Sequence, residues 1–159
     1  MPAGRKVRRS VCRFTSRGLF RRVYNCAEAF ARRADVNHVT GDVNFLALVL
    51  PGRRTILTIH DCEPLTRTAG MKRVLLRTLW YQLPMRSVSR VTAIAAFTRD
   101  ELVRLTGADA ASIEVIPDCI SGAFQPAPAV FDEQRPTILV VGTGHTKNLS
   151  RLFAALEGL

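Results

Sequence analysis

The chain has 159 residues, of which 47% are hydrophobic and 23% are charged, which is the composition of a globular domain and not of a disordered segment. Its longest uninterrupted apolar run, Phe45 to Leu50, is far shorter than the ~20 residues that a membrane-spanning helix needs, so we expect no transmembrane segment. The formal net charge of +10 is concentrated at one end, because residues 1–33 hold ten basic side chains and a single acid, Glu28.

The basic segment 1–33 could contact phosphates or an anionic bilayer surface, at about 1 kcal/mol for each Lys or Arg near the surface. It contains no interleaved aromatic platform and no nucleic-acid-binding signature, so nucleic acid is not the partner that we expect. An Arg-rich, acid-poor start is also typical of a transit peptide. We interpret the segment first as a solvated basic face, with peripheral contact to an anionic membrane as an alternative.

The first predicted element is an amphipathic helix over residues 19–33, with arginines toward solvent and an apolar side that we expect to pack on a sheet. That apolar side comprises Leu19, Val23, Cys26, Ala27 and Phe30. A very short strand is predicted over 36–39. A short buried helix is predicted over 43–50, where Pro51 and Gly52 end it.

The next segment, Thr55–Ile59, is rich in apolar and β-branched residues and predicts a buried strand that runs directly into His60 and Asp61. In an open parallel sheet, residues just past the carboxyl end of a strand face the ligand crevice. This position makes His60 and Asp61 candidate catalytic residues. The alternative is structural, because a His-Asp pair at a strand end often only holds a loop by a hydrogen bond.

A longer helix is predicted over residues 70–88, ended or kinked by Pro84. Its shared apolar face is Val74, Leu75, Leu79 and Leu83, with Trp80 and Tyr81 at the edge. A strand follows over 91–95. Thr98-Arg99-Asp100-Glu101 forms a capping box that predicts the start of a helix ending at Gly107.

A further strand over 113–116 completes an alternation of short apolar strands with helices. This alternation predicts an α/β fold with a Rossmann-like parallel sheet covered by helices on both faces. A polar, proline-rich segment over 122–136 then predicts an interdomain linker. A new strand over 137–141 and a helix from Leu149 predict the first β-α unit of a second Rossmann-like domain.

The loop between that last strand and helix comprises Gly142, Thr143, Gly144, Lys147 and Asn148, with two further residues. A glycine-containing loop ahead of a helix N-terminus offers backbone amides and a positive dipole end to a phosphate, and Lys147 adds a point charge. The loop matches neither the dinucleotide fingerprint nor the P-loop spacing. A capped turn without a ligand is therefore the alternative.

The four cysteines, at positions 12, 26, 62 and 119, have no close paired spacing. A structural zinc site needs two ligands a few residues apart, so we expect no metal. The same spacing leads us to expect reduced thiols and a cytoplasmic location, with peripheral contact at the inner face of the membrane left open.

In their order and spacing these pieces resemble the family 4 glycosyltransferases, which are retaining enzymes with two Rossmann-like domains (the GT-B fold). The resemblance runs from about Ala34 to the end of the chain and rests on seven short stretches. They are Ala34 to His38, Thr58 to Asp61, Val91 to Ile94, Thr98 to Leu102, Ile116 to Asp118, Ile138 to Gly142, and Lys147 to Leu149.

The resemblance implies a domain organisation. Residues 1–33 would form a basic arm and helix, 34–121 a portion of the acceptor-binding domain, 122–136 the linker, and 137–159 the start of the donor-binding domain. The family's paired-glutamate motif has no counterpart here, and Thr143 stands where the family often has arginine. We therefore expect a fragment of a longer enzyme that is inactive by itself.

The resemblance also implies a reaction, the transfer of a hexosyl group from a nucleotide-diphosphate sugar to an acceptor hydroxyl with retention. His60 matches the family's histidine near the transferred sugar, and Lys147 matches the basic residue that neutralises the donor diphosphate, which Gly142 allows to approach. No cofactor is implied beyond the donor substrate, and the acceptor is an unknown glycan, lipid or small molecule.

Two other classes of protein remain open from the sequence. One is a non-catalytic α/β module whose basic arm binds nucleic acid or an anionic membrane surface. The other is a different Rossmann-like enzyme, such as an epimerase of similar architecture.

Overall fold

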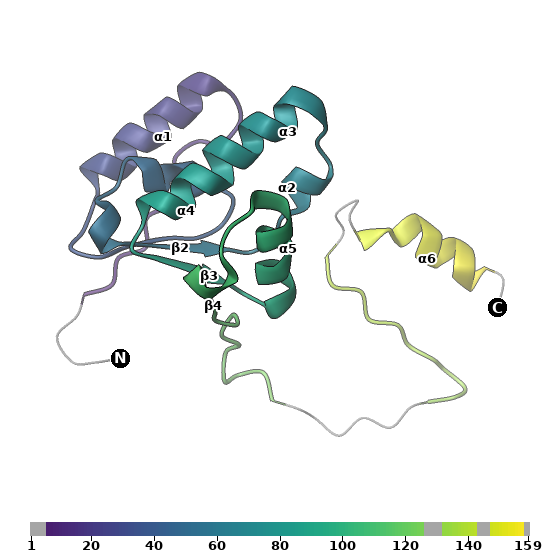
Figure 1. Cartoon of the computed structure of the whole chain (residues 1–159). Coiled ribbons are helices and arrows are strands. Elements are labelled where there is room, and N and C mark those ends of the chain that lie inside the picture. Colours follow the sequence, from purple (N-terminus) through teal and green to yellow (C-terminus); the bar gives the residue numbers. More distant parts are fainter. Residues whose placement is uncertain (1–5, 126–131, 143–146, 158–159) are drawn as a thin grey trace. The chain divides into compact units, whose positions relative to one another are not determined.

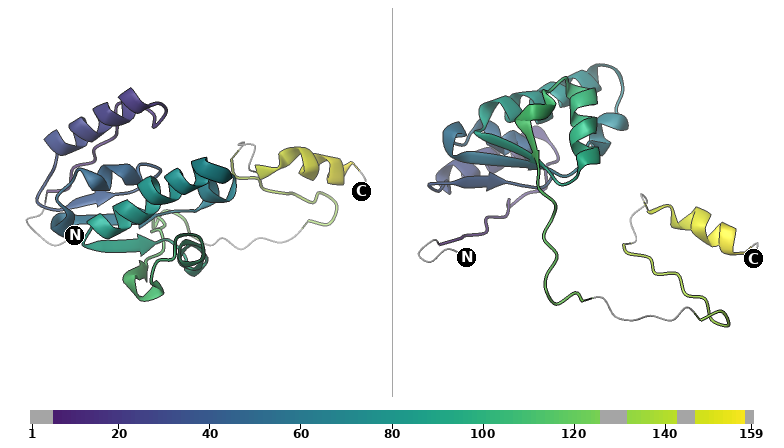
Figure 2. Two further views of the ribbon diagram at one scale, coloured as in Figure 1. Left: turned by 45° about the horizontal axis from the view of Figure 1, so that its top comes forward. Right: turned by 60° about the horizontal axis from the view of Figure 1, so that its bottom comes forward.

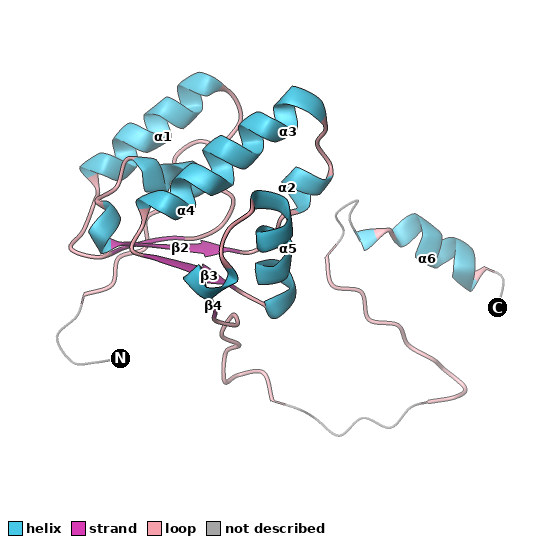
Figure 3. Cartoon of the chain, in the orientation of Figure 1, coloured by secondary structure: helices cyan, strands magenta, loops and turns pink. Residues whose placement is uncertain are grey.

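The computed structural model describes residues 6–125, 132–142 and 147–157. The chain divides into two compact units, Met1–Cys119 and Ile120–Leu159. Figure 1 shows the ribbon of the whole chain, and Figure 3 marks its helices and strands. Because the positions of the two units relative to each other are not determined, each unit is described by itself.

The first unit is built on a four-stranded parallel sheet in the order β1-β2-β3-β4. The strands are β1 (Asn37–Val39), β2 (Thr55–Ile59), β3 (Arg90–Ala93) and β4 (Ile113–Val115). Leu57 at the centre of β2 pairs with Val39 on one side and with Val91 on the other. The predicted α/β fold with a Rossmann-like parallel sheet is therefore confirmed.

Helices connect the strands. The α-helices of the first unit are α1 (Leu19–Ala31), α2 (Glu63–Thr66), α3 (Gly70–Leu76), α4 (Leu83–Ser87) and α5 (Ala96–Thr106). The 3-10 turns are η1 (Asn44–Leu48), η2 (Gly52–Arg54) and η4 (Ala110–Ser112), and a π-helical segment, η3 (Arg77–Gln82), joins α3 to α4.

The connecting helices lie on one face of the sheet, as Figures 1 and 2 show. Neighbouring strands in the sheet are also consecutive in the chain, and right-handed crossovers between such strands place every connecting helix on the same side. The prediction that helices cover both faces is therefore wrong for the described residues. The second face presents His38, Thr58 and Thr92, which lie on three adjacent strands.

The core lies between the sheet and this helical layer. Leu57 and Ile59 of β2 are buried there against Leu65, Tyr81 and Leu102. Each fully buried side chain of this size stabilises the fold by about 1.5–3 kcal/mol relative to an exposed one. This packing fixes the position of β2 and therefore of the residues that follow it.

Helix α1 occurs where the periodicity predicts it, but it presents the opposite face to the domain. Its buried residue is Asn25, whereas Leu19, Val23 and Phe30 of the predicted inward face are exposed. The reason is that α1 packs mainly on η1 and on residues 12–16, and this surface supplies polar partners. The predicted inward direction is therefore wrong for most of the apolar face, whereas Cys26 of the same predicted face packs against the core.

The predicted helix over 70–88 also presents a different face. Trp80 and Tyr81 are core residues, and the predicted inward residues Val74, Leu75, Leu79 and Leu83 are exposed. The π-helical turn of η3 adds a residue to one turn and changes the phase of the residues from Arg77 onward, whereas Val74 and Leu75 precede it in α3, which has no buried residue. Pro84 lies in the first turn of α4 and does not end the helical segment.

The predicted capping box is likewise wrong, although the helix is present. Helix α5 begins three residues earlier than predicted, with Ala95 at its N-cap in place of Thr98 and no side-chain cap. The Thr98 hydroxyl donates to the carbonyl oxygen of His60 at 3.2 Å, so it contacts the sheet and does not cap the helix. The predicted end at Gly107 is confirmed, because Gly107 has φ of 72°, in the left-handed region that favours glycine.

In the second unit the predicted helix is confirmed as α6 (Leu149–Leu156). The predicted strand over 137–141 is wrong, because those residues form no strand and their apolar side chains are exposed. A strand needs a neighbour to satisfy its backbone groups, and no described residue of this unit supplies one.

Candidate functional site

The candidate site is the edge of the sheet where the parallel strands end. Thr40 follows β1, His60 follows β2, and Asp118 lies three residues beyond β4. The parallel pairing brings these ends together although up to 78 positions separate them in the chain. Such an edge is where open α/β sheets bind ligands.

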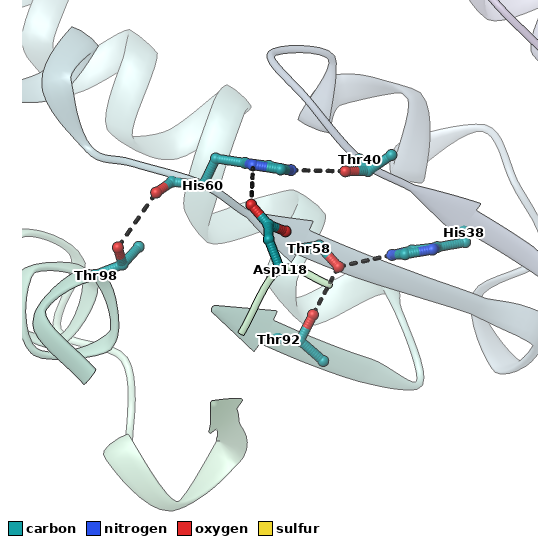
Figure 4. A network of polar contacts seen from close by, with 7 residues as sticks. All are labelled: His38, Thr40, Thr58, His60, Thr92, Thr98 and Asp118. Carbon is teal, nitrogen blue, oxygen red and sulfur yellow. Dashed lines mark hydrogen bonds and ion pairs between the residues drawn. The ribbon is translucent and has the colours of Figure 1, made fainter. Parts of the chain in front are cut away.

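His60 is the central side chain of this edge (Figure 4). Its Nε2 atom hydrogen-bonds the Thr40 hydroxyl at 2.7 Å, and its Nδ1 atom lies 3.8 Å from an Asp118 carboxylate oxygen. Its carbonyl oxygen accepts the hydroxyl hydrogen of Thr98. The ring is thus oriented from two sides while 36% of the side chain stays exposed. This combination holds an imidazole in place and leaves it open to a ligand.

A second row of polar contacts lies on the adjoining strands (Figure 4). The Thr58 hydroxyl is 2.7 Å from His38 Nε2 and 2.7 Å from the Thr92 hydroxyl. Thr58 and Thr92 are directly opposite each other in the register of β2 and β3, and both are buried. Sequence reasoning missed this row. The signal that could have found it is a threonine that interrupts each apolar strand.

Asp61 has a different position from the one expected for a partner of His60. One of its carboxylate oxygens accepts the Glu63 amide at 3.1 Å, and its carbonyl oxygen accepts the Tyr81 hydroxyl at 3.4 Å. Asp61 therefore holds the start of α2. In the described part of the chain, the carboxylate that the fold brings to the His60 ring is that of Asp118.

Two buried ionisable groups, the Cys62 thiol and the Tyr81 phenol, lie in the core close to this edge in the chain or by hydrogen bond. Burial, with the negative charge of Glu101 as a smaller cause, raises the pKa of the Cys62 thiol to about 12. Burial also raises the pKa of the Tyr81 phenol. Both groups are therefore neutral at physiological pH, and Cys62 is a packing residue, since only a thiolate is an effective nucleophile.

The candidate phosphate loop lies in the second unit. Gly142 has φ of 87°, and a Cβ atom at this position would lie 3.4 Å from Cε of Lys147, so the lysine stem runs beside the glycine backbone. The backbone of Asn148 is in the left-handed region, with φ of 52°, and Asn148 directly precedes α6. The exposed Lys147 thus lies beside Gly142 and two positions ahead of α6 in the chain. Thr143 and Gly144 lie outside the described residues.

No three His, Cys, Asp or Glu side chains come together as a metal site within the residues that the structure describes. None of the described helices combines the length and the apolar character needed to cross a membrane.

A broad hollow of about 1040 Å³ lies at the other end of the sheet. Its lining includes Ser89 and Arg90 at the start of β3, and Ser112 at the start of β4. We assign the site to the carboxyl edge because parallel α/β sheets bind ligands there and because the oriented histidine lies there. The volume of the hollow alone does not outweigh that chemistry.

Comparison with known proteins identifies the family of the chain. The model of Glycosyltransferase Family 4 matches residues 3–121, which is more than half of the chain and includes all four strands, Thr40, His60 and Asp118. No curated protein and no solved structure matches the chain. The chain belongs to glycosyltransferase family 4.

Proposed function

We propose that this chain provides the acceptor-domain side of an enzyme that transfers a hexosyl group from a nucleotide-diphosphate sugar to an acceptor hydroxyl, with retention at the anomeric carbon. The observation that carries the proposal is the imidazole of His60, oriented by Thr40 and Asp118 at the carboxyl edge of the sheet. The acceptor is a glycan, a lipid or a small molecule.

In this proposal His60 contacts the sugar that is transferred. When the bond between the anomeric carbon and the leaving oxygen breaks, both electrons stay on the nucleotide diphosphate, so negative charge grows there. Preorganised positive groups stabilise such charge. We assign this role to Lys147 and to the amides around Gly142 and Asn148, with Thr143 and Gly144 in the same loop.

Asp61 is retained in the proposed site as a residue that positions the loop after β2. Its carboxylate holds the Glu63 amide, and this contact fixes the backbone immediately after His60. No cofactor is required, because the donor substrate carries the activated sugar. The free thiols Cys12, Cys26, Cys62 and Cys119 support the proposal of a reducing, cytoplasmic setting.

We also propose that this chain alone binds donors weakly and does not turn over. The support is the state of the second unit, in which Ile138, Leu139 and Val141 are exposed although a donor domain would bury them in a sheet.

A nucleotide titration of the full chain tests the proposal. Labelled protein is titrated with UDP and with GDP, and amide chemical shifts are followed. We expect saturable binding of one nucleotide with a Kd on the order of 1 mM. Lys147→Ala should weaken it about tenfold, because a charge-assisted hydrogen bond contributes about 1.5–3 kcal/mol.

Two controls belong to this titration. Lys147→Arg keeps the charge and should keep most of the affinity. Lys72→Ala removes an exposed lysine of α3 in the first unit and should leave the affinity unchanged. Absence of saturable binding, or equal losses in Lys147→Ala and Lys72→Ala, would contradict the assignment of the diphosphate site.

A further inference from the structure

Helix α1 is amphipathic, but its polar side faces the domain. The buried Asn25 side chain donates to the Phe14 carbonyl oxygen at 2.8 Å and accepts the Phe14 amide at 3.3 Å. Arg22 Nε donates to the Ser16 carbonyl oxygen, and its guanidinium lies 4.6 Å from the centre of the Trp80 ring. Rotation of α1 to bury its other side would break all of these contacts, so the orientation of α1 is fixed by its polar side.

Because the polar side of α1 faces the domain, its outward side is apolar. It comprises Leu19, Phe20, Val23, Tyr24 and Phe30, which lie within three helical turns. Phe20 is 90% exposed and Leu19 is 72% exposed. Clustered apolar side chains of this size mark an interaction surface, because leaving them in water costs about 25 cal/mol per Å² of apolar area. We call these five residues the α1 face.

Positive charge surrounds the α1 face. Arg17 and Arg21 lie near its start, and Arg33 lies at its end, with its guanidinium 4.2 Å from the centre of the Phe30 ring. The single acid among the first 33 residues, Glu28, is on the opposite side, where one carboxylate oxygen pairs with Arg32 at 3.0 Å and the other accepts the Arg13 amide at 3.1 Å. No acidic side chain of α1 therefore opposes an anionic partner.

We propose that the α1 face is a docking surface for the interface of an anionic lipid bilayer. A helix with aromatic and aliphatic residues on one side and arginines around it lies flat at such an interface, with its apolar residues at the acyl boundary and its arginines among the phosphates. The proposal concerns the surface of α1 alone and holds whatever reaction the enzyme catalyses.

Charge decides between a bilayer and the other occupants. Two copies that met through the α1 face would bring two strongly basic segments together, and like charges oppose such contact. A nucleic acid would neutralise the arginines but would leave Leu19, Phe20 and Val23 in water. An anionic bilayer satisfies both the charge and the apolar side chains.

Flotation of the full chain with vesicles tests the proposal. Vesicles of phosphatidylcholine alone are compared with vesicles that also contain phosphatidylglycerol, and binding is expected only to the second. The double variant Phe20→Gln, Val23→Gln should weaken binding at least about tenfold, since two apolar side chains no longer enter the interface. Arg17→Gln with Arg21→Gln should also weaken binding more than tenfold.

Matched controls separate docking from a folding defect. Phe97 of α5 is 73% exposed, so Phe97→Gln removes an equally accessible phenylalanine elsewhere and should leave vesicle binding unchanged. Because the α1 face is exposed, circular dichroism of each variant should match the parent chain.

The depth of α1 gives an independent readout. The chain has one tryptophan, Trp80, which is buried. In Phe20→Trp the added indole should be quenched by brominated acyl chains in anionic vesicles, whereas Trp80 in the parent chain should not be quenched. Quenching in Phe20→Trp that is absent at high salt supports docking through charge and insertion together.

Several results would overturn the proposal. These are equal binding to both kinds of vesicle, vesicle binding that Phe20→Gln with Val23→Gln leaves intact, and no quenching of Phe20→Trp. Concentration-dependent dimerisation that Phe20→Gln with Val23→Gln abolishes, together with no vesicle binding, would assign the α1 face to a second copy instead.

Discussion

Two segments of the chain have almost the same kind of sequence and opposite structures. Thr55–Ile59 and residues 137–141 each begin with threonine and continue with apolar and mostly β-branched residues. The first is β2, paired on both sides, and its Leu57 is fully buried. The second forms no strand, and its Leu139 is 86% exposed.

The difference shows what a strand-forming sequence specifies. Preference for extended backbone is local, whereas a strand exists only where neighbouring backbone accepts its hydrogen bonds. β2 has β1 and β3 as neighbours. The same condition places His60, since β2 and its neighbours deliver Thr40 and Asp118 to the imidazole.

The largest expected effect is in amide hydrogen exchange. Amides of β2 should exchange only through global unfolding, which slows them at least about a thousandfold for a domain of ordinary stability. Amides of residues 137–141 should exchange at nearly the rate of an unstructured peptide. Exchange is measured by mass spectrometry or NMR on the full chain. Comparable protection in the two segments would show that residues 137–141 are as well hydrogen-bonded as β2.

Truncating one leucine in each segment tests whether that segment is packed. Leu57→Ala should lower the free energy of unfolding by about 2–5 kcal/mol, because it leaves a cavity in the core. Leu139→Ala makes the same truncation in the second segment and should change the free energy of unfolding by less than about 0.5 kcal/mol. Chemical denaturation followed by circular dichroism measures both. Equal effects would show that Leu139 is packed.

A smaller effect is expected from the polar row on the sheet. Thr58→Val removes a hydroxyl that contacts His38 and the buried Thr92 hydroxyl, so it should destabilise the first unit by about 1–3 kcal/mol. Adding Thr92→Val removes the orphaned hydroxyl and should recover part of that loss. A double variant that simply sums the two single losses would show that the two hydroxyls act independently.

The effect that is smallest near neutral pH is a pH dependence that contrasts Cys62 with the exposed Cys119. Burial raises the pKa of Cys62 from 9.0 to about 12. The unfolded thiol therefore ionises between these values while the folded one stays protonated, so the stability that is fully present below pH 9.0 falls as pH rises toward 12.

Cys62→Ala should flatten part of this alkaline loss, as measured by denaturation midpoints across pH, and Tyr81 should contribute in the same direction. At neutral pH a thiol reagent should modify Cys119 while Cys62 stays protected. Modification of Cys62 at the same rate in the native protein would show that the residues around it open readily.

The sequence predicts the positions of the elements better than their orientation. Four short strands and the helices near 19–31 and 96–106 follow from local patterns. The outward face of α1 does not, because it depends on contacts between Asn25 and Phe14, which is eleven positions away. The inward turn of Trp80 and Tyr81 depends on a π-helical turn that leaves no simple signal in the sequence.

The candidate site shows the same division. His60 could be found because it ends a recognisable strand, and Lys147 because it lies ahead of a helix. Asp118 and Thr40 could not be assigned to His60, since only the order of the strands brings them there. Thr98 was assigned to a cap because its local spacing fits one, while the fold uses its hydroxyl for the His60 carbonyl.

We propose that a sugar nucleotide binds the first unit at the carboxyl edge of the sheet and not at the hollow on the other end. Chemical-shift mapping of the labelled full chain with UDP- and GDP-hexoses tests it most directly. We expect the shifts within the first unit to cluster at His60, Thr98 and Asp118. Shifts clustered at Ser89 and Ser112 around the hollow, or no shift in the first unit, would contradict it.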